Sequence, residues 1–107
     1  MAKKLVILGS GESGTGAAIL AQQQGFEVFV SDKGKIRDSY KHELSSRGIA
    51  FEEGKHSMDI ILAADEIIKS PGIQEKYDVM KQIRAANKIV VGEIEFAWRY
   101  CKGKVVA

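Results

Sequence analysis

Hydrophobic and polar residues follow two alternating patterns along this chain. Short hydrophobic runs, such as Val6–Leu8 and Val28–Val30, are typical of buried strands. Longer stretches between them carry hydrophobic residues at every third or fourth position, as amphipathic helices do. Strands separated by helices predict a parallel sheet with right-handed crossovers and helices on both faces. We therefore expect an α/β fold with three α/β/α layers and a mostly parallel sheet of about five strands.

Glycine, proline and polar residues mark the ends of these elements. The predicted strands cover Lys4–Leu8, Glu27–Ser31, Ile49–Glu52, Glu66–Lys69 and Lys88–Val91, and a further strand is expected at 104–107. The predicted helices cover Ser13–Gln24, Arg37–Ser46, Met58–Ala64, Lys76–Ala86 and Glu93–Tyr100. Periodicity places in the core Ile36, Tyr40 and Leu44 of the second helix, and Ile94, Ala97, Trp98 and Cys101 of the last.

The first strand leads into a Gly-x-Gly-x-x-Gly sequence at Gly9, Gly11 and Gly14, and the second strand leads to Asp32. Gly9 permits a tight turn, Gly11 lets the backbone approach a pyrophosphate, and Gly14 allows close packing of helix on strand. The N–H groups at the helix start can bind an anion, and Asp32 can accept from a sugar or a base. This order of elements is typical of a Rossmann-like nucleotide-binding unit.

Four loops are expected at the carboxyl edge of the sheet, where ligands of such folds bind. They span residues 9–14, 32–35, 70–73 and 92–95, and all are polar or rich in glycine. Glu93 and Glu95 fall in the first turn of the last helix, where acidic side chains suit the helix dipole.

Composition narrows the class of protein. The 107 residues suffice for one domain, and their net charge of +2, with acids and bases interspersed, favours neither nucleic acid nor a membrane as partner. No hydrophobic run approaches the roughly 18 residues of a spanning helix, and the start of the chain does not resemble a secretory leader. The single cysteine, Cys101, cannot form an internal disulfide, so we expect a cytoplasmic protein. His42 and His56 have no metal-binding spacing, and we expect them to be solvated or locally paired.

The loop sequences together resemble the N-terminal domain of the Mur ligases, which build the peptide of peptidoglycan. The resemblance covers the whole chain and is carried by Gly9–Gly14, Val30–Asp32, Ser70-Pro-Gly-Ile73 and Gly92-Glu-Ile-Glu-Phe96. The Ser-Pro-Gly sequence favours the D-glutamate-adding branch over the L-alanine-adding branch. In this family the first of three domains binds the UDP part of the substrate, the second binds ATP, and the third binds the incoming amino acid.

The resemblance implies a UDP site at the carboxyl edge of the sheet. The diphosphate would be held by backbone N–H groups and the Ser13 hydroxyl, while Asp32 would contact uracil or ribose. Glu12 departs from the apolar residue more common in the family, and Lys33 and Gly34 stand where Thr and Arg are common. The implied site residues are Gly11, Glu12, Ser13, Gly14, Asp32, Lys33, Ser70, Pro71 and Gly72.

Simpler roles remain open for several of these residues. Ser13 could cap the first helix, Asp32 could be an exposed turn residue, and Pro71-Gly72 could form a plain turn. Lys33 or Lys35 could replace the missing arginine, or both could be solvated.

The resemblance also implies that residues 1–107 are a single UDP-binding domain at the N-terminus of a longer, monomeric ligase. Its substrate would be UDP-N-acetylmuramoyl-L-alanine. ATP, Mg2+ and D-glutamate would be bound outside this chain, which contains no Gly-x-x-x-x-Gly-Lys-[Ser/Thr] sequence. We therefore expect no catalytic residue, metal ligand or cofactor in this domain.

Two other hypotheses account for part of the pattern. A nicotinamide-dinucleotide module of a dehydrogenase or sensor would use the same glycines, with Asp32 on the ribose hydroxyls. A flavodoxin-like interaction or receiver domain would bind no nucleotide and would leave the glycine loop unexplained. Binding of UDP or of NAD distinguishes these hypotheses.

Overall fold

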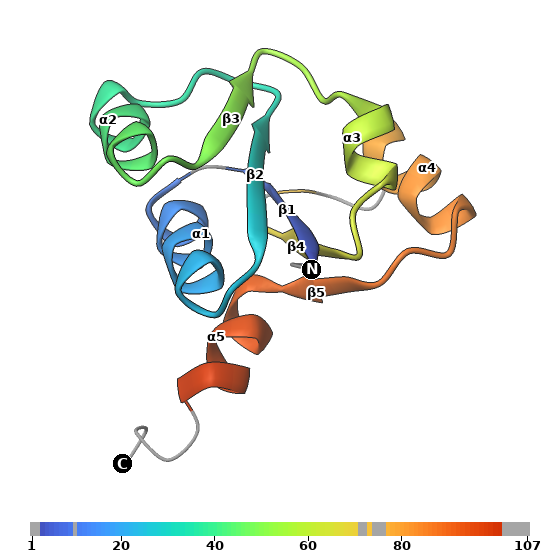
Figure 1. Cartoon of the computed structure of the whole chain (residues 1–107). Helices are drawn as coiled ribbons and strands as arrows, with labels where there is room; N and C mark the ends of the chain where they lie inside the picture. The colour runs from blue at the N-terminus through green and yellow to red at the C-terminus, as the bar shows by residue number, and fades with distance from the viewer. Residues whose placement is uncertain (1–2, 10, 71–72, 74–76, 102–107) are drawn as a thin grey trace.

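The computed structural model describes residues 3–9, 11–70, 73 and 77–101, apart from the side chains of Ser13 and Cys101. Strands and helices alternate through this part of the chain (Figure 1). The strands are β1 (Lys4–Leu8), β2 (Glu27–Asp32), β3 (Ala50–Glu53), β4 (Glu66–Lys69) and β5 (Val90–Gly92). The helices are α1 (Glu12–Gln23), α2 (Asp38–Ser46), α3 (Met58–Leu62), α4 (Asp78–Ala85) and α5 (Glu93–Cys101). The sequence-based elements differ from these only at their ends, and the strand expected at 104–107 lies outside the described residues.

The five strands form one parallel sheet in the order β3-β2-β1-β4-β5. The chain therefore moves outward from β1 on one side, then returns to place β4 on the other side of β1. Helices α1, α2 and α5 cover one face of the sheet, and α3 and α4 cover the other (Figure 1). The expected three-layer α/β fold is confirmed. Its topological switch point lies between β1 and β4, where ligands of such sheets bind.

Strand β1 is buried from both sides because it lies in the middle of the sheet. Leu5 and Ile7 pack against α1, α2 and α5, while Val6 and Leu8 pack against α3 and α4. Each fully buried side chain of this size stabilises the fold by about 1.5–3 kcal/mol. This packing anchors the turn that follows β1. The two clusters also contain Ala18, Val30, Leu44 and Ile68 on the first face, and Ile61, Met80 and Ile83 on the second.

The predicted core face of α5 is wrong. Phe96 is fully buried, whereas Ile94 is 71% exposed and Trp98 is 56% exposed. The helix packs through Phe96 and Tyr100, whose ring centroids are 5.1 Å apart, and Phe96 also meets Phe26 edge-on. Two hydrophobic stripes overlap on this short helix, and periodicity alone does not show which one faces α1.

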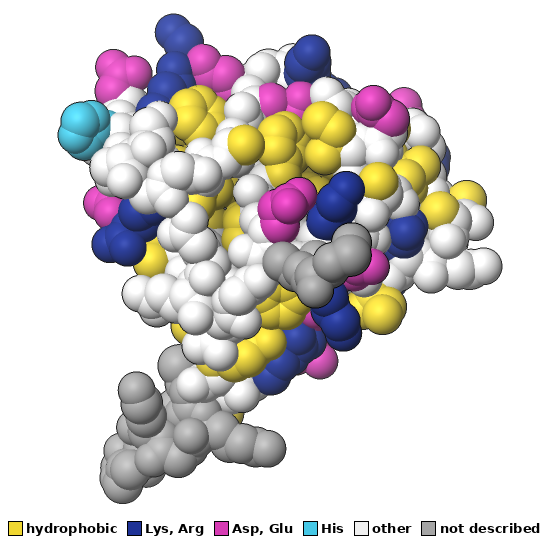
Figure 2. All heavy atoms as spheres, in the orientation of Figure 1, with side chains coloured by type: hydrophobic (Ala, Val, Ile, Leu, Met, Phe, Trp, Pro, Cys, Tyr) yellow, Lys and Arg dark blue, Asp and Glu magenta, His cyan; other side chains and the backbone are white. Residues whose placement is uncertain are grey.

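Some of the other core predictions are confirmed and others are wrong. Ile36 and Leu44 are buried, as expected, but Tyr40 is partly exposed. Ala97 is also partly exposed, and the side chain of Cys101 lies outside the described part of the structure. Charged side chains of both signs are interspersed over the face shown in Figure 2, with hydrophobic patches between them.

Candidate functional site

In the turn from β1 into α1, the backbone at the end of the strand lies close to the backbone of the first helical turn. Gly9 has a φ of +95°, and its N–H donates to the carbonyl oxygen of Ser31 over 2.9 Å. A Cβ on Gly14 would overlap the carbonyl oxygen of Gly9. The expected roles of Gly9 in the turn and of Gly14 in helix–strand packing are therefore confirmed.

The start of α1 is open toward the carboxyl edge of the sheet. Gly11 is the N-cap residue, and a Cβ added to it would meet nothing within 4 Å. The first intrahelical bond runs from the N–H of Thr15 to the carbonyl of Gly11 over 2.9 Å, so the N–H groups before it lack intrahelical acceptors. Because α1 begins at Glu12, Ser13 lies within the first turn, and the hypothesis that Ser13 is the N-cap is wrong. Glu12 is exposed.

Asp32 lies at the end of β2 and shapes the loop that follows. Its Oδ1 accepts a hydrogen bond from the N–H of Gly34 over 2.8 Å. The carbonyl of Gly34 in turn accepts from the N–H of Gly54, after β3, over 3.0 Å. Asp32 is partly exposed and Lys33 is exposed, so both can reach a ligand at this edge.

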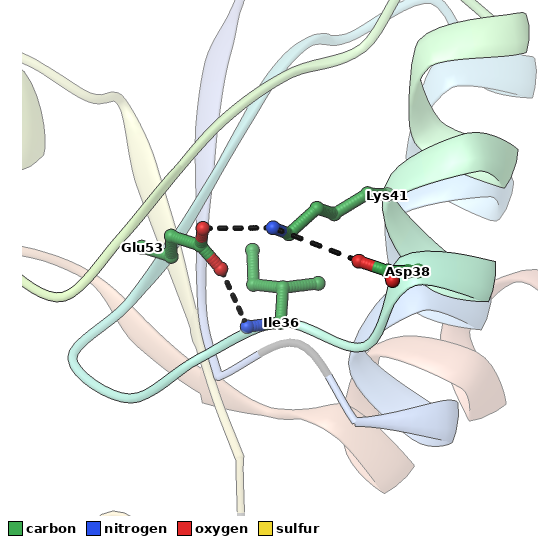
Figure 3. Close-up of polar contacts among 4 residues, drawn as sticks. All are labelled: Ile36, Asp38, Lys41 and Glu53. Carbon is green, nitrogen blue, oxygen red and sulfur yellow. Dashed lines mark hydrogen bonds and ion pairs between the residues drawn. The ribbon is translucent and has the colours of Figure 1, made fainter.

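Glu53 holds the other end of this loop. One carboxylate oxygen accepts from the N–H of Ile36 and the other from Nζ of Lys41, each over 2.8 Å (Figure 3). The hydrogen bond from Lys41 holds the pKa of Glu53 below its ordinary value. Lys41 also lies 3.9 Å from the carboxylate of Asp38 (Figure 3). Sequence reasoning missed Glu53, because its partners come from a loop and a helix that pattern alone does not bring together.

A second network joins the ends of β2 and β3. The buried hydroxyl of Ser31 lies 2.8 Å from Oε2 of Glu52 and 2.7 Å from Nδ1 of His56. Glu52 also accepts from the N–H and the hydroxyl of Ser57, over 2.7 and 2.6 Å. Burial raises the pKa of Glu52, but these hydrogen bonds outweigh burial and lower it overall. The expectation that each histidine is solvated or locally paired is confirmed, since His56 is paired with Ser31 and His42 is exposed.

Ser70 lies at the switch point of the sheet. Its N–H donates to the carbonyl of Leu8 over 3.1 Å, and a Cβ on Gly9 would lie 2.8 Å from the Cβ of Ser70. The carbonyl of Ser70 accepts from the N–H of Ile73 over 3.0 Å. The turn therefore brings Ile73 back toward this edge, while Pro71 and Gly72, also predicted for the site, lie outside the described residues.

Glu93 follows β5 directly and differs from Glu95 in its surroundings. Glu93 is only 6% exposed, and neither carboxylate oxygen has a hydrogen-bond partner within the described part of the chain. Burial raises its pKa, although the nearby hydroxyl of Ser70 offsets part of this effect. The helix dipole suffices for the exposed Glu95, but it does not explain a buried carboxyl group such as Glu93.

An open pocket of about 750 Å3 lies beside Lys33, between the β3–α3 loop and the start of α4. A second hollow, of about 590 Å3, lies at the amino ends of β1, β2 and β3 and is remote from these loops. Within the described residues, no three His, Cys, Asp or Glu side chains are grouped to hold a metal ion, and no helix could cross a membrane. The walls of the 750 Å3 pocket beside Lys33 also include His56, Met58, Ile73, Tyr77 and Val79.

The structure brings the predicted site residues it describes to one edge of the sheet, on the ends of β1, β2 and β4. A glycine turn, an open helix start and an acid at the end of the neighbouring strand define a doubly wound domain of the nucleotide-binding type. The model of the family described as Mur ligase MurD-like, N-terminal domain, matches residues 3–92. The chain therefore belongs to this family.

Known relatives agree with this assignment. The chain is 52% identical over 104 residues to the UDP-N-acetylmuramoylalanine--D-glutamate ligase of Bacteroides thetaiotaomicron, covering 97% of the chain and 23% of that ligase. It thus spans about a quarter of the length of this curated relative. A pseudomurein peptide ligase type C from Methanothermus fervidus superposes with a TM-score of 0.80 at 30% identity, over 92% of this chain and 20% of that one.

A murein peptide ligase from Psychrobacter arcticus superposes with a TM-score of 0.83 at 21% identity, over 92% of this chain and 20% of that one. At this identity the likeness shows the fold alone. The family match, rather than the fold, favours the ligase-domain hypothesis over a dehydrogenase module or an interaction domain.

Proposed function

We propose that this chain binds the UDP part of UDP-N-acetylmuramoyl-L-alanine, as the N-terminal domain of the ligase that adds D-glutamate during peptidoglycan synthesis. Family membership and the names of the relatives support the substrate class. The site at the carboxyl edge of the sheet supports the mode of binding.

The glycine turn is the observation that carries the proposal. Gly14 lets α1 approach β1 so closely that a side chain is excluded, while Gly11 faces open space at the helix start. A diphosphate can therefore reach the N–H groups of Glu12, Ser13 and Gly14, where the helix dipole favours negative charge. The exposed carboxylate of Glu12 can turn toward solvent, which limits its repulsion of the diphosphate.

The nucleoside would lie beside Asp32, at the end of β2, and Ser70, directly after β4, which flank the glycine turn. The pocket next to Lys33 has both apolar walls, from Met58, Ile73 and Val79, and polar groups, a combination that suits a base and a sugar. Lys33 would supply positive charge near the phosphates.

The chemistry of ligation would take place outside these 107 residues. The family implies ATP and Mg2+, yet the chain has no Gly-x-x-x-x-Gly-Lys-[Ser/Thr] sequence to hold ATP phosphates. D-glutamate and ATP would be bound by further domains of a cytoplasmic, monomeric enzyme. We expect these 107 residues alone to form no amide bond and to hydrolyse no ATP.

Calorimetric titration of the chain with UDP, UDP-N-acetylmuramoyl-L-alanine and NAD tests the proposal. Saturable binding of both uridine ligands and no binding of NAD is the expected result. Binding of NAD alone would support the dinucleotide module, for which Asp32 is equally well placed on β2.

Gly11→Ala is the informative variant for this titration. A Cβ at this position has room in the free protein, so stability should change by less than about 1 kcal/mol. The same Cβ would stand where the diphosphate approaches, and UDP affinity should fall about tenfold. Gly16→Ala, in the same helix and also in open space, is the matched control and should leave UDP affinity unchanged.

A further inference from the structure

His56 lies between a buried hydrogen-bond network and the pocket beside Lys33. Its Nδ1 is 2.7 Å from the hydroxyl oxygen of Ser31, which is completely buried. The same residue forms part of the pocket wall, together with Lys33, Ile73 and Tyr77. The Nδ1 side of the imidazole is thus hydrogen-bonded to the protein interior, while the residue also lines a pocket that a ligand can enter.

The count of protons in the network determines which nitrogen of His56 carries hydrogen. Glu52 accepts both the N–H and the hydroxyl of Ser57, which favours its ionised form and makes it an acceptor only. The Ser31 hydroxyl has two acceptors, Oε2 of Glu52 at 2.8 Å and the carbonyl oxygen of Lys55 at 3.3 Å, and neither can donate back, so its single proton is used on this side, chiefly on the nearer Glu52. The contact between Ser31 and His56 then requires a proton on Nδ1, which donates to the hydroxyl oxygen.

The surroundings also keep the imidazole neutral. Burial lowers the pKa of His56, the charges of Glu52 and Asp32 oppose this effect, and Lys33 adds to it, with a net lowering. A neutral ring with a proton on Nδ1 has a bare Nε2, which is a hydrogen-bond acceptor. The two nitrogens of an imidazole point outward in different directions, so Nε2 is directed away from Ser31.

We propose that His56 is a ligand-binding residue of this site, with Nε2 accepting a hydrogen bond from a neutral O–H or N–H donor of the bound nucleoside. The nucleoside of UDP offers three such donors, the 2′- and 3′-hydroxyls of the ribose and the N3–H of uracil. Glu52 and Ser31 are positioning residues, because they fix the tautomer of His56 without touching the ligand. The inference rests on the proposed binding of UDP.

The first test measures the imidazole nitrogens by long-range proton–nitrogen NMR at pH 8. The expected spectrum of His56 shows a protonated Nδ1 and a bare Nε2, and addition of UDP should shift Nε2. His42, exposed on α2, serves as the internal reference and should not respond to UDP. A proton on Nε2 of His56 in the free protein would overturn the proposal.

The second test compares His56→Asn with His42→Asn. The amide nitrogen of asparagine can take the place of Nδ1 and donate to Ser31, but asparagine places no acceptor where Nε2 was. We expect UDP affinity to fall about 5–10-fold in His56→Asn and to stay unchanged in His42→Asn. Circular dichroism checks that both variants fold.

Comparison of UDP with three analogues identifies the donor and excludes an indirect effect. If a ribose hydroxyl donates, His56→Asn should lose the preference for UDP over either 2′-deoxy-UDP or 3′-deoxy-UDP; if the base donates, it should lose the preference for UDP over CDP. An equal loss of affinity for all four ligands would overturn the proposal, since it would indicate a structural role. UDP-dependent amide shifts at Gly14 and Asp32 without a response at His56 would overturn this inference alone, whereas no shift anywhere would overturn the proposed function itself.

Discussion

Two glutamates at the carboxyl edge of the sheet have opposite surroundings. Glu52, in β3, accepts hydrogen bonds from Ser31 and from the N–H and hydroxyl of Ser57. Glu93, directly after β5, is 6% exposed and has two unpartnered oxygens among the described residues. The pKa of Glu52 is lowered overall, and that of Glu93 is raised by burial.

The two sides of the switch point therefore differ in how far the fold provides hydrogen-bond partners for a carboxyl group. On the β2–β3 side, hydrogen bonds fix the orientation of a pocket residue without any ligand, which would preorganise the proposed binding site. On the β4–β5 side, the fold keeps a buried carboxyl group whose pKa is raised by burial. Because burial of a poorly hydrogen-bonded charge costs stability, we expect Glu93 to weaken the free chain at neutral pH.

Gly14→Ala should disrupt both sides, because it acts on the turn that they share. The new Cβ would overlap the carbonyl of Gly9, which forces α1 away from β1. We expect the free energy of unfolding to fall by about 3 kcal/mol in urea titrations. Gly16→Ala, which has open space in the same helix, should instead gain up to about 1 kcal/mol from helix propensity. Equal stability of the two variants would contradict this account of the turn.

Ser31→Ala should weaken the β2–β3 side specifically. The change removes the donor to Glu52 and the acceptor for His56 from a fully buried position. Leaving these groups unsatisfied should lower the free energy of unfolding by about 2 kcal/mol. Ser46→Ala, which removes an exposed hydroxyl bonded to the carbonyl of Glu43, should change it by less than about 0.5 kcal/mol.

Glu93→Gln should strengthen the β4–β5 side at neutral pH. A carboxyl whose pKa is raised on folding gives its full contribution below the unfolded pKa and loses it as pH rises through the folded value. The variant should therefore equal the parent chain near pH 4 and exceed it by about 1 kcal/mol at pH 7. Glu95→Gln, at an exposed position in the same turn, should show no such gain. A gain for Glu93→Gln that does not depend on pH would argue against charge burial.

Acid should destabilise the β2–β3 side through His56, and this effect should be smaller. The pKa of His56 is lowered on folding, so the folded chain binds this proton more weakly than the unfolded chain does. Stability is then complete above the ordinary value of 6.5 and declines as pH falls below it. The stability difference between the parent chain and His56→Asn should narrow between pH 7 and pH 5. No change with pH would show that the pKa of His56 is the same in the folded and the unfolded chain, which would contradict the lowered folded pKa.

The sequence predicts the frame of this site better than the connections within it. The positions of Gly9, Gly14 and Asp32 could be predicted from the sequence, because a tight turn, a close helix–strand contact and a strand end require particular residue types at fixed spacing. The hydrogen bonds that Glu53 accepts from Ile36 and Lys41 join elements whose relative placement depends on the order of strands in the sheet. No local sequence pattern therefore predicts them. The prediction of the core face of α5 was wrong for a related reason, since packing against the neighbouring α1 determines which hydrophobic stripe is buried.

The most direct test of the central claim is a map of backbone amide shifts in the chain as UDP is added. The account predicts shifts at Gly11, Gly14, Asp32 and His56, on the carboxyl edge, and none around Gly48, in the hollow at the amino edge. Saturation of these shifts together would establish one UDP site at the switch side of the sheet. Saturating shifts confined to the amino edge, or no shifts at any UDP concentration, would contradict it.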